Sequence, residues 1–249
     1  DDAARAGAPY WSPLVAPQID IAQSYKADGG LNDKLRSQGI TARLVAPSGG
    51  IVKGWSAVVT TGEEDNSRAV VASRIAQHLR LTAVRGNRSF PNSPMGAVAL
   101  ARQAFYDARW YRDAWNAHRN QPTLPSPERN DALEALQSVV SGPALCIADA
   151  SDEQFVLRAD QFAREFNVRL VVRGSGREYR RLDAIRDLNR TLIIPVDFPR
   201  PPHVQTAETA LSIALEDLMH WELAPENPAM LEKAGVAELT GGACMVGKL

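Results

Sequence analysis

The sequence is poor in the residues that cross-link small proteins or hold metal ions. Its 249 residues include only two cysteines and four histidines. Cys146 and Cys244 are too few for a disulfide framework or for a zinc site made of cysteines. The sequence leaves undecided whether the two form one disulfide bond with each other. These counts exclude small disulfide-stabilised domains and zinc fingers, and they leave the cellular compartment undecided.

The sequence also lacks a strong net charge and a long apolar run. Its 28 Lys and Arg residues nearly balance 29 Asp and Glu residues, which gives a formal net charge of −1. Nucleic-acid binding relies on an excess of positive charge, so we expect no nucleic-acid partner. No apolar run approaches the ~20 residues of a membrane-spanning helix, so we expect no membrane span. What is present is 45% hydrophobic residues, enough for a full core.

The first half of the chain has one clear helix and several short elements. Residues 1–30 are rich in Pro and aromatic residues, which predicts an extended segment. In residues 31–120, a helix at 31–38 precedes β-rich runs at 40–46 and 55–61. Ser93 and Pro94 are a typical start for a long helix. Its apolar residues recur every three or four positions and predict one buried stripe: Met95, Val98, Ala101, Phe105, Ala108, Tyr111 and Trp115.

Residues 128–240 repeat a strand-and-helix rhythm. Apolar strands at 144–150, 168–173 and 191–196 alternate with helices at 152–166 and 178–188. Such repeats predict parallel strands, and continuous apolar strands indicate that both faces of the sheet are covered. A helix at 206–221 and a weak strand at 236–239 follow. Periodicity alone leaves a barrel and an open, doubly wound sheet as alternatives.

Three stretches together resemble a known family. They are SQGITARLVAPSGGIVKGWSA at 37–57, PNSPMGAVALARQAF at 91–105 and WELAPENPAMLEKAGV at 221–236. In order and spacing they are similar to bacterial amidohydrolases related to imidazolonepropionase and dihydroorotase, over roughly residues 9–240. The resemblance implies an α/β fold of parallel β/α repeats, here a partial (β/α)8, TIM-like barrel. We therefore expect one incomplete barrel domain over 1–249, with an extended segment at 1–30, β/α parts at 31–120 and 128–240, and a tail at 241–249.

The family also implies a metal site that this sequence does not match. Its members hydrolyse amides with water activated by divalent metals at the carboxyl ends of the barrel strands, using histidines, a Lys or Glu, and an Asp. Here Ala148 and Asp149 stand at one strand end and Arg173 at the next, where histidines would be expected. The strand with the family's first histidine pair would lie before Asp1. We therefore predict no metal ligands and interpret the chain as a truncated or degenerate member.

The residues left at these strand ends suggest two alternatives. Asp149, Arg173 and Asp197 all end predicted strands, and His203 lies in the loop beyond the last, so a barrel would bring them to one rim. They could bind a polar ligand, because Arg offers a bidentate fork to a carboxylate. Alternatively, Asp149 and Arg173 form only an ion pair. The loops at 47–50 and 174–176 could hold an anion on backbone N–H groups or serve as plain turns.

Two functions follow from these observations. In the first, the chain is a non-catalytic structural or assembly subunit without a cofactor, and a protein partner or missing segments cover its open barrel edges. In the second, it is an extracytoplasmic metal-dependent amidohydrolase, with zinc held by ligands outside this chain. The resemblance favours a periplasmic or secreted location. The sequence leaves enzymatic activity, substrate, partner and oligomeric state undecided.

Overall fold

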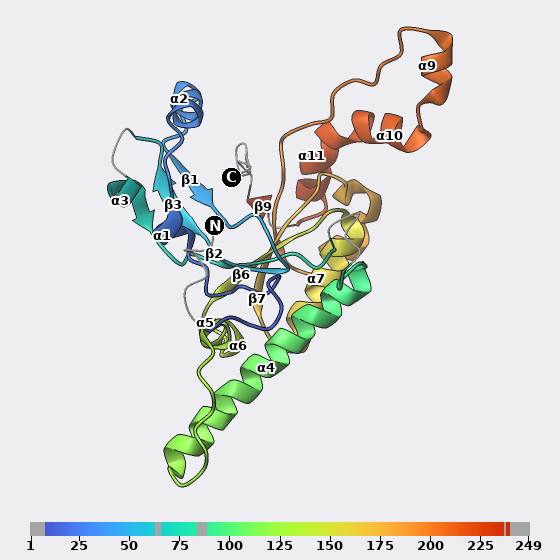
Figure 1. The fold of residues 1–249 in the computed structure, drawn as a ribbon. Coiled ribbons are helices and arrows are strands. Elements are labelled where there is room, and N and C mark those ends of the chain that lie inside the picture. Colours follow the sequence, from blue (N-terminus) through green and yellow to red (C-terminus); the bar gives the residue numbers. More distant parts are fainter. Residues whose placement is uncertain (1–7, 63–65, 84–88, 237, 240–249) are drawn as a thin grey trace. The chain divides into compact units, whose positions relative to one another are not determined.

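A computed structural model describes residues 8–62, 66–83, 89–236 and 238–239, with its elements labelled in Figure 1. The chain divides into two compact units. Among the described residues, unit 1 lies within 8–147 and 163–169, and unit 2 within 148–162 and 170–239. The chain passes between the units within β6 (Leu145–Asp149), α7 (Glu153–Phe166) and β7 (Arg169–Arg173). The single incomplete barrel domain expected from the sequence stays a prediction.

The strands of unit 1 upstream of β6 pair antiparallel. β1 (Ala42–Val45) pairs with β3 (Ala57–Thr60), which pairs with β4 (Val70–Ala72), while β2 (Val52–Trp55) pairs with β5 (Gln77–Leu79). Strands were predicted near 40–46 and 55–61, and both are present. The parallel pairing predicted for residues 128–240 does not extend to these strands, because no helix lies between β1 and β3 to make the crossover that parallel strands need.

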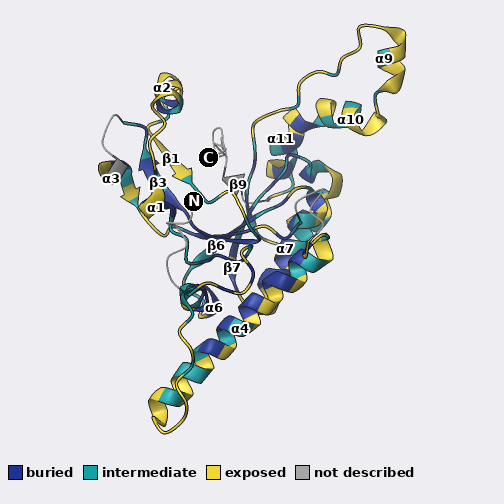
Figure 2. Ribbon diagram, in the orientation of Figure 1, coloured by how far each residue is buried: buried dark blue, intermediate teal, exposed yellow. Residues whose placement is uncertain are grey.

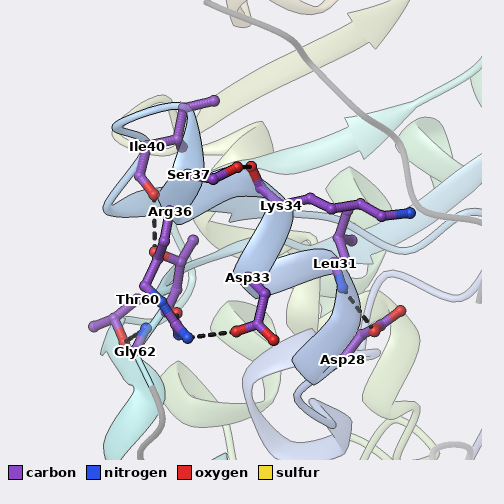
Figure 3. Close-up of polar contacts among 10 residues, drawn as sticks. Asp28, Leu31, Asp33, Lys34, Arg36, Ser37, Ile40, Thr60 and Gly62 are labelled. Carbon is purple, nitrogen blue, oxygen red and sulfur yellow. Dashed lines mark hydrogen bonds and ion pairs between the residues drawn. The ribbon is translucent and has the colours of Figure 1, made fainter.

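Three short helices accompany these strands, namely α1 (Ile21–Ser24), α2 (Gly29–Ser37) and α3 (Asn66–Ala69). α2 matches the helix predicted at 31–38. The Asp28 carboxylate accepts the Leu31 N–H at 3.0 Å and caps its first turn (Figure 3). Near its end, the Arg36 guanidinium pairs with Asp33 and donates to the Thr61 carbonyl. The bond from Arg36 to Thr61 attaches α2 to the end of β3.

The long helix α4 (Pro94–Asn120) begins as predicted, with the Ser93 hydroxyl accepting the Gly96 N–H at 3.2 Å. The burial of Ala101, Phe105, Ala108 and Tyr111 confirms the central part of the predicted stripe, while Met95 is 81% exposed. The stripe is therefore wrong at its first turn. Figure 2 shows the alternation of buried and exposed residues along this helix.

Two short helices, α5 (Asp131–Ala135) and α6 (Gln137–Val140), pack against α4 in unit 1. The Gln137 side-chain amide donates to the Ala108 carbonyl at 3.1 Å, and Leu136 and Val139 are fully buried. The aromatic rings of Phe105 and Phe166 meet with their centroids 5.1 Å apart. The buried face of α4 is therefore a packing surface, as the sequence predicts.

Unit 2 contains the parallel strands. β7 pairs parallel with β8 (Thr191–Ile193), and β8 pairs parallel with β9 (Glu238–Leu239). The η2 turn (Glu178–Arg181) and α8 (Leu182–Arg186) connect β7 to β8, as a parallel pair requires. Parallel strands in a mixed α/β fold are thus confirmed for this region. No strand pairing closes a barrel within the described residues.

The predicted helix over 206–221 is two helices, α9 (Ala207–Ser212) and α10 (Leu215–Leu223), with extended backbone at Ile213 and Ala214. The Ser212 hydroxyl donates to the Thr209 carbonyl, a local bond that competes with helix continuation, and β-branched Ile213 follows. Neither helix has a buried residue. η3 (Ala224–Glu226) and α11 (Asn227–Lys233) complete the described helices of unit 2.

Candidate functional site

The candidate site lies in unit 2, where β6 and β7 end. The Asp149 carboxylate accepts a hydrogen bond from Nε of Arg173 at 2.9 Å, and the two side chains are 11% and 30% exposed. Backbone bonds join the chain just beyond these strand ends, from Ala150 N–H to the Arg173 carbonyl and from Gly174 N–H to the Ile193 carbonyl, both at 2.9 Å. The ends of β6, β7 and β8 are therefore linked through their backbones.

The turn after β7 encloses a buried carboxylate. Glu178 is completely buried and accepts the N–H groups of Ser175 at 2.6 Å and Gly176 at 3.0 Å. The Asn227 side-chain amide, at the start of α11, donates to the same carboxylate at 2.8 Å, and the Ser175 hydroxyl donates at 3.3 Å. These donors satisfy a group that would otherwise be costly to bury.

This arrangement decides how the 174–176 loop is used. The sequence leaves it open as an anion-binding loop or a plain turn. Its backbone N–H groups at Ser175 and Gly176 do hold an anion, but that anion is the chain's own Glu178. A Cβ at Gly174 would lie 2.5 Å from Oε1 of Glu178, and Gly176 has a φ of +84°. Both glycines are therefore needed for a turn this close to its carboxylate.

Asn227 ties this turn to a second element of unit 2. Its side-chain oxygen accepts the Tyr179 N–H at 2.7 Å while its amide nitrogen donates to Glu178. Asn227 is completely buried. The turn after β7 and the first turn of α11 therefore share one polar network, in which Asn227 acts as both donor and acceptor.

The other two predicted site residues lie further along the chain. β8 ends at Ile193, earlier than the predicted 196, so Asp197 lies beyond the strand rather than at its end. Asp197 and His203 are both exposed in the irregular segment between β8 and α9. No hydrogen bond or ion pair of the described residues joins either one to Asp149 or Arg173. A ligand-binding role for these four residues stays a prediction.

A neighbouring group of charged and aromatic residues escaped the sequence analysis. Glu216 on α10 accepts hydrogen bonds from Arg177 at 2.8 Å and Arg180 at 3.0 Å. The His220 ring stacks on Tyr179 with an interplanar angle of 20°, and its Nδ1 lies 3.4 Å from the Tyr179 hydroxyl. Glu216 and His220 are four residues apart, and residues at that spacing share a face of a helix. The sequence therefore did indicate that these two side chains lie on one face. The sequence could not show that η2 is their partner.

The histidines and cysteine of the described residues lie on separate elements. His78 is buried on β5, His118 bonds the Leu124 carbonyl near the end of α4, and His220 lies on α10. Cys146 is buried in β6, and burial raises the pKa of its thiol, whereas Cys244 lies outside the described residues. Among the described residues, no three His, Cys, Asp or Glu side chains group closely enough to hold a metal ion.

The second glycine-rich loop lines a small hollow in unit 1. Ser48, Gly49 and Gly50 border a cavity of about 60 Å³ together with Leu14, Ile51, Arg80, Thr82, Ala83 and Pro91. Whether residues 47–50 hold an anion or form a plain turn stays a prediction.

Comparison with known proteins identifies a similar fold. No protein-family model and no curated protein matches the sequence. The solved structure of an amidohydrolase from Thermotoga maritima is similar, with a TM-score of 0.69 and 15% identity. The match covers 91% of this chain and 57% of that protein, so the chain spans little more than half of its length. The chain thus has a distant amidohydrolase-like fold, in agreement with the resemblance read from the sequence.

One further property is relevant to function. None of the helices in the described part of the chain is both long and apolar enough to cross a membrane.

Proposed function

We propose that this chain is a partial (β/α)8 scaffold of the amidohydrolase type that serves as a non-catalytic structural or assembly subunit. The observation that carries the proposal is the Asp149–Arg173 ion pair at the ends of β6 and β7. The family resemblance expects metal-binding histidines at these two strand ends. At these two strand ends this chain has the Asp149 carboxylate and the Arg173 guanidinium, which form an ion pair.

The guanidinium makes these strand ends unfavourable for a divalent cation. Arg keeps its positive charge at any physiological pH. A divalent cation coordinated by Asp149 would have to displace this guanidinium from the carboxylate and would be repelled by its positive charge. Arg173 therefore favours the ion pair over a metal ion at this position.

Elemental analysis and an activity assay on the purified full-length protein test the proposal. Protein produced with added zinc should hold less than about a tenth of an equivalent of metal and hydrolyse neither cyclic amides nor N-acyl amino acids. An Arg173→Met variant should also stay free of zinc in competition with a coloured chelator, because no three His, Cys, Asp or Glu side chains of the described residues group at Asp149 to hold the ion. Arg177→Met is the matched control, because Arg177 pairs with Glu216 instead. Near-stoichiometric zinc with amide hydrolysis by the wild type would overturn the proposal.

The second candidate is a metal-dependent amidohydrolase whose remaining ligands lie outside this chain. It is supported by the fold likeness to the Thermotoga maritima amidohydrolase and by the 57% share of that protein that the chain covers. Under this proposal, the same assays on the full-length protein give about one equivalent of zinc or more and measurable amide hydrolysis. Removing the zinc with a chelator abolishes that hydrolysis, and adding zinc back restores it.

A further inference from the structure

The helices α9 and α10 both expose apolar and acidic side chains. Leu211 is 87% exposed, Leu215 70% and Met219 45%. Leu215, Met219 and Glu222 follow at steps of four and three, so they lie on one side of α10. Glu208 lies one turn before Leu211 on α9. We call these five residues the acidic apolar face; Figure 2 shows the two helices largely in the colour of exposed residues.

The chain segment that carries this face is rich in acidic residues. Between Arg200 and Lys233 the sequence has no Lys or Arg, but it has six acidic residues: Glu208, Glu216, Asp217, Glu222, Glu226 and Glu232. Only one of the six, Glu216, forms an ion pair among the salt bridges of the described residues. The helices therefore present a negative surface around their exposed apolar side chains.

The contacts of α10 with the rest of unit 2 leave this face uncovered. Glu216 bonds Arg177 and Arg180, and His220 stacks on Tyr179. Glu216 and His220 each follow one residue after Leu215 and Met219, which places them about 100° further round α10. One side of the helix is thus attached to the η2 turn, and another keeps large apolar groups in water.

The chemistry of the face selects the kind of partner. Leu211, Leu215 and Met219 keep apolar area in water, and burying that area against a partner is favourable. Exposed apolar groups rimmed by polar residues are typical of interaction sites. The acidic rim favours a positively charged partner, because complementary charges speed association and suppress wrong partners. It also opposes binding to membranes, whose cytoplasmic surfaces are negative.

We propose that the acidic apolar face binds a basic amphipathic helix of a partner protein. Such helices bind through apolar residues spaced at three and four positions, which is the spacing that this face itself presents. The inference rests on the assembly role proposed above and names the class of partner. It needs no residue of the Asp149–Arg173 site.

Binding of short synthetic helices to the full-length protein tests this inference. The probes are a labelled amphipathic peptide of Leu and Lys and the same peptide with Glu in place of Lys, followed by fluorescence anisotropy. Wild-type protein should bind the Lys peptide and not the Glu peptide. A Leu211→Ser/Leu215→Ser variant should bind at least about tenfold more weakly, a loss of ~1.4 kcal/mol. A Glu208→Lys/Glu222→Lys variant should bind more weakly too, and more so at low salt.

The matched control is Val71→Ser, which removes an exposed apolar side chain from β4 and should leave peptide binding unchanged. Circular dichroism of each variant shows that it is folded. Equal binding by wild type and the Leu211→Ser/Leu215→Ser variant, or no binding of the Lys peptide by wild type, overturns the inference. Zinc-dependent hydrolysis by a protein that binds the peptide through Leu215 overturns the non-catalytic role alone. A zinc-free protein that ignores the peptide overturns the docking face alone.

Discussion

The turn after β7 and the acidic apolar face of α9 and α10 belong to the same unit, yet they use charged residues in opposite ways. In the turn, the Glu178 carboxylate is fully buried and bonded to donors from Ser175, Gly176 and Asn227. On the face, Glu208 and Glu222 are exposed beside large apolar side chains. A buried carboxylate is tolerated only when donors converge on it, whereas an exposed one costs little. The turn therefore stabilises the fold, and the face is available for binding.

The largest expected effect in this comparison is that of Glu178→Ala. The substitution leaves the buried N–H groups of Ser175 and Gly176 and the Asn227 amide without their acceptor. We expect the free energy of unfolding to fall by about 3–5 kcal/mol, measured by chemical denaturation. Glu232→Ala, at an exposed position on α11, is the control and should change it by less than about 0.5 kcal/mol. A loss below about 1 kcal/mol for Glu178→Ala would contradict the role of this network.

Gly174→Ala sharpens the same point. The added methyl group would lie 2.5 Å from Oε1 of Glu178, so the carboxylate must move away from its donors. We expect a loss of about 1–3 kcal/mol in the free energy of unfolding. Gly49→Ala meets no atom within 4 Å and should be neutral or slightly stabilising. Equal free energies of unfolding for Gly174→Ala and Gly49→Ala would show that the turn can move to accept the methyl group, and would contradict the prediction.

The Asp149–Arg173 ion pair should couple more weakly than the Glu178 network, because Arg173 is 30% exposed. In a double-mutant cycle with Asp149→Asn and Arg173→Gln, we expect a coupling energy of about 1 kcal/mol. Thermal and chemical unfolding of the four proteins provide the measurement. A coupling indistinguishable from zero would mean that the pair does not hold the ends of β6 and β7 together.

His220 should make the attachment of α10 sensitive to pH. Burial, followed by the charges of Arg177 and Arg180, lowers its pKa below the ordinary 6.5, although Asp217 and Glu178 act in the opposite direction. Because the unfolded chain then takes up the proton more readily, the stabilisation is present above pH ~6.5 and is lost as pH falls through the lower folded pKa. Melting temperatures from pH 8 to 5 should fall more for wild type than for His220→Phe. Parallel curves for the two proteins would refute this.

The smallest expected effect belongs to the acidic apolar face. Leu215→Ser should change the free energy of unfolding by no more than about 0.5 kcal/mol, because the side chain is 70% exposed. Leu231→Ser on α11, where the leucine is fully buried, should cost about 3 kcal/mol or more. Chemical denaturation of both variants tests the contrast. A large loss for Leu215→Ser would indicate that the face is covered within the chain.

Local signals in the sequence determined much of the secondary structure. The cap at Ser93 and the apolar strands near β6, β7 and β8 follow from patterns a few residues long, and the parallel pairing of β7 with β8 follows from the strand-and-helix repeat. The same logic pointed to Asp149 and Arg173 as neighbours, because adjacent strands that run parallel end at one edge. The resemblance to amidohydrolases agrees with the fold found by comparison.

Other features were decided by tertiary contacts. The apolar spacing of residues 206–221 fits a buried helix and an exposed one equally well, and only the surroundings leave α9 and α10 in solvent. The antiparallel pairing of β1 with β3 and β2 with β5 depends on how the chain turns back on itself. Glu178 is the clearest case, because one of its donors, Asn227, lies 49 residues further along the chain. The periodicity of a short segment indicates which of its side chains can be buried. The residues that cover those side chains come from other parts of the chain, so only the tertiary structure identifies them.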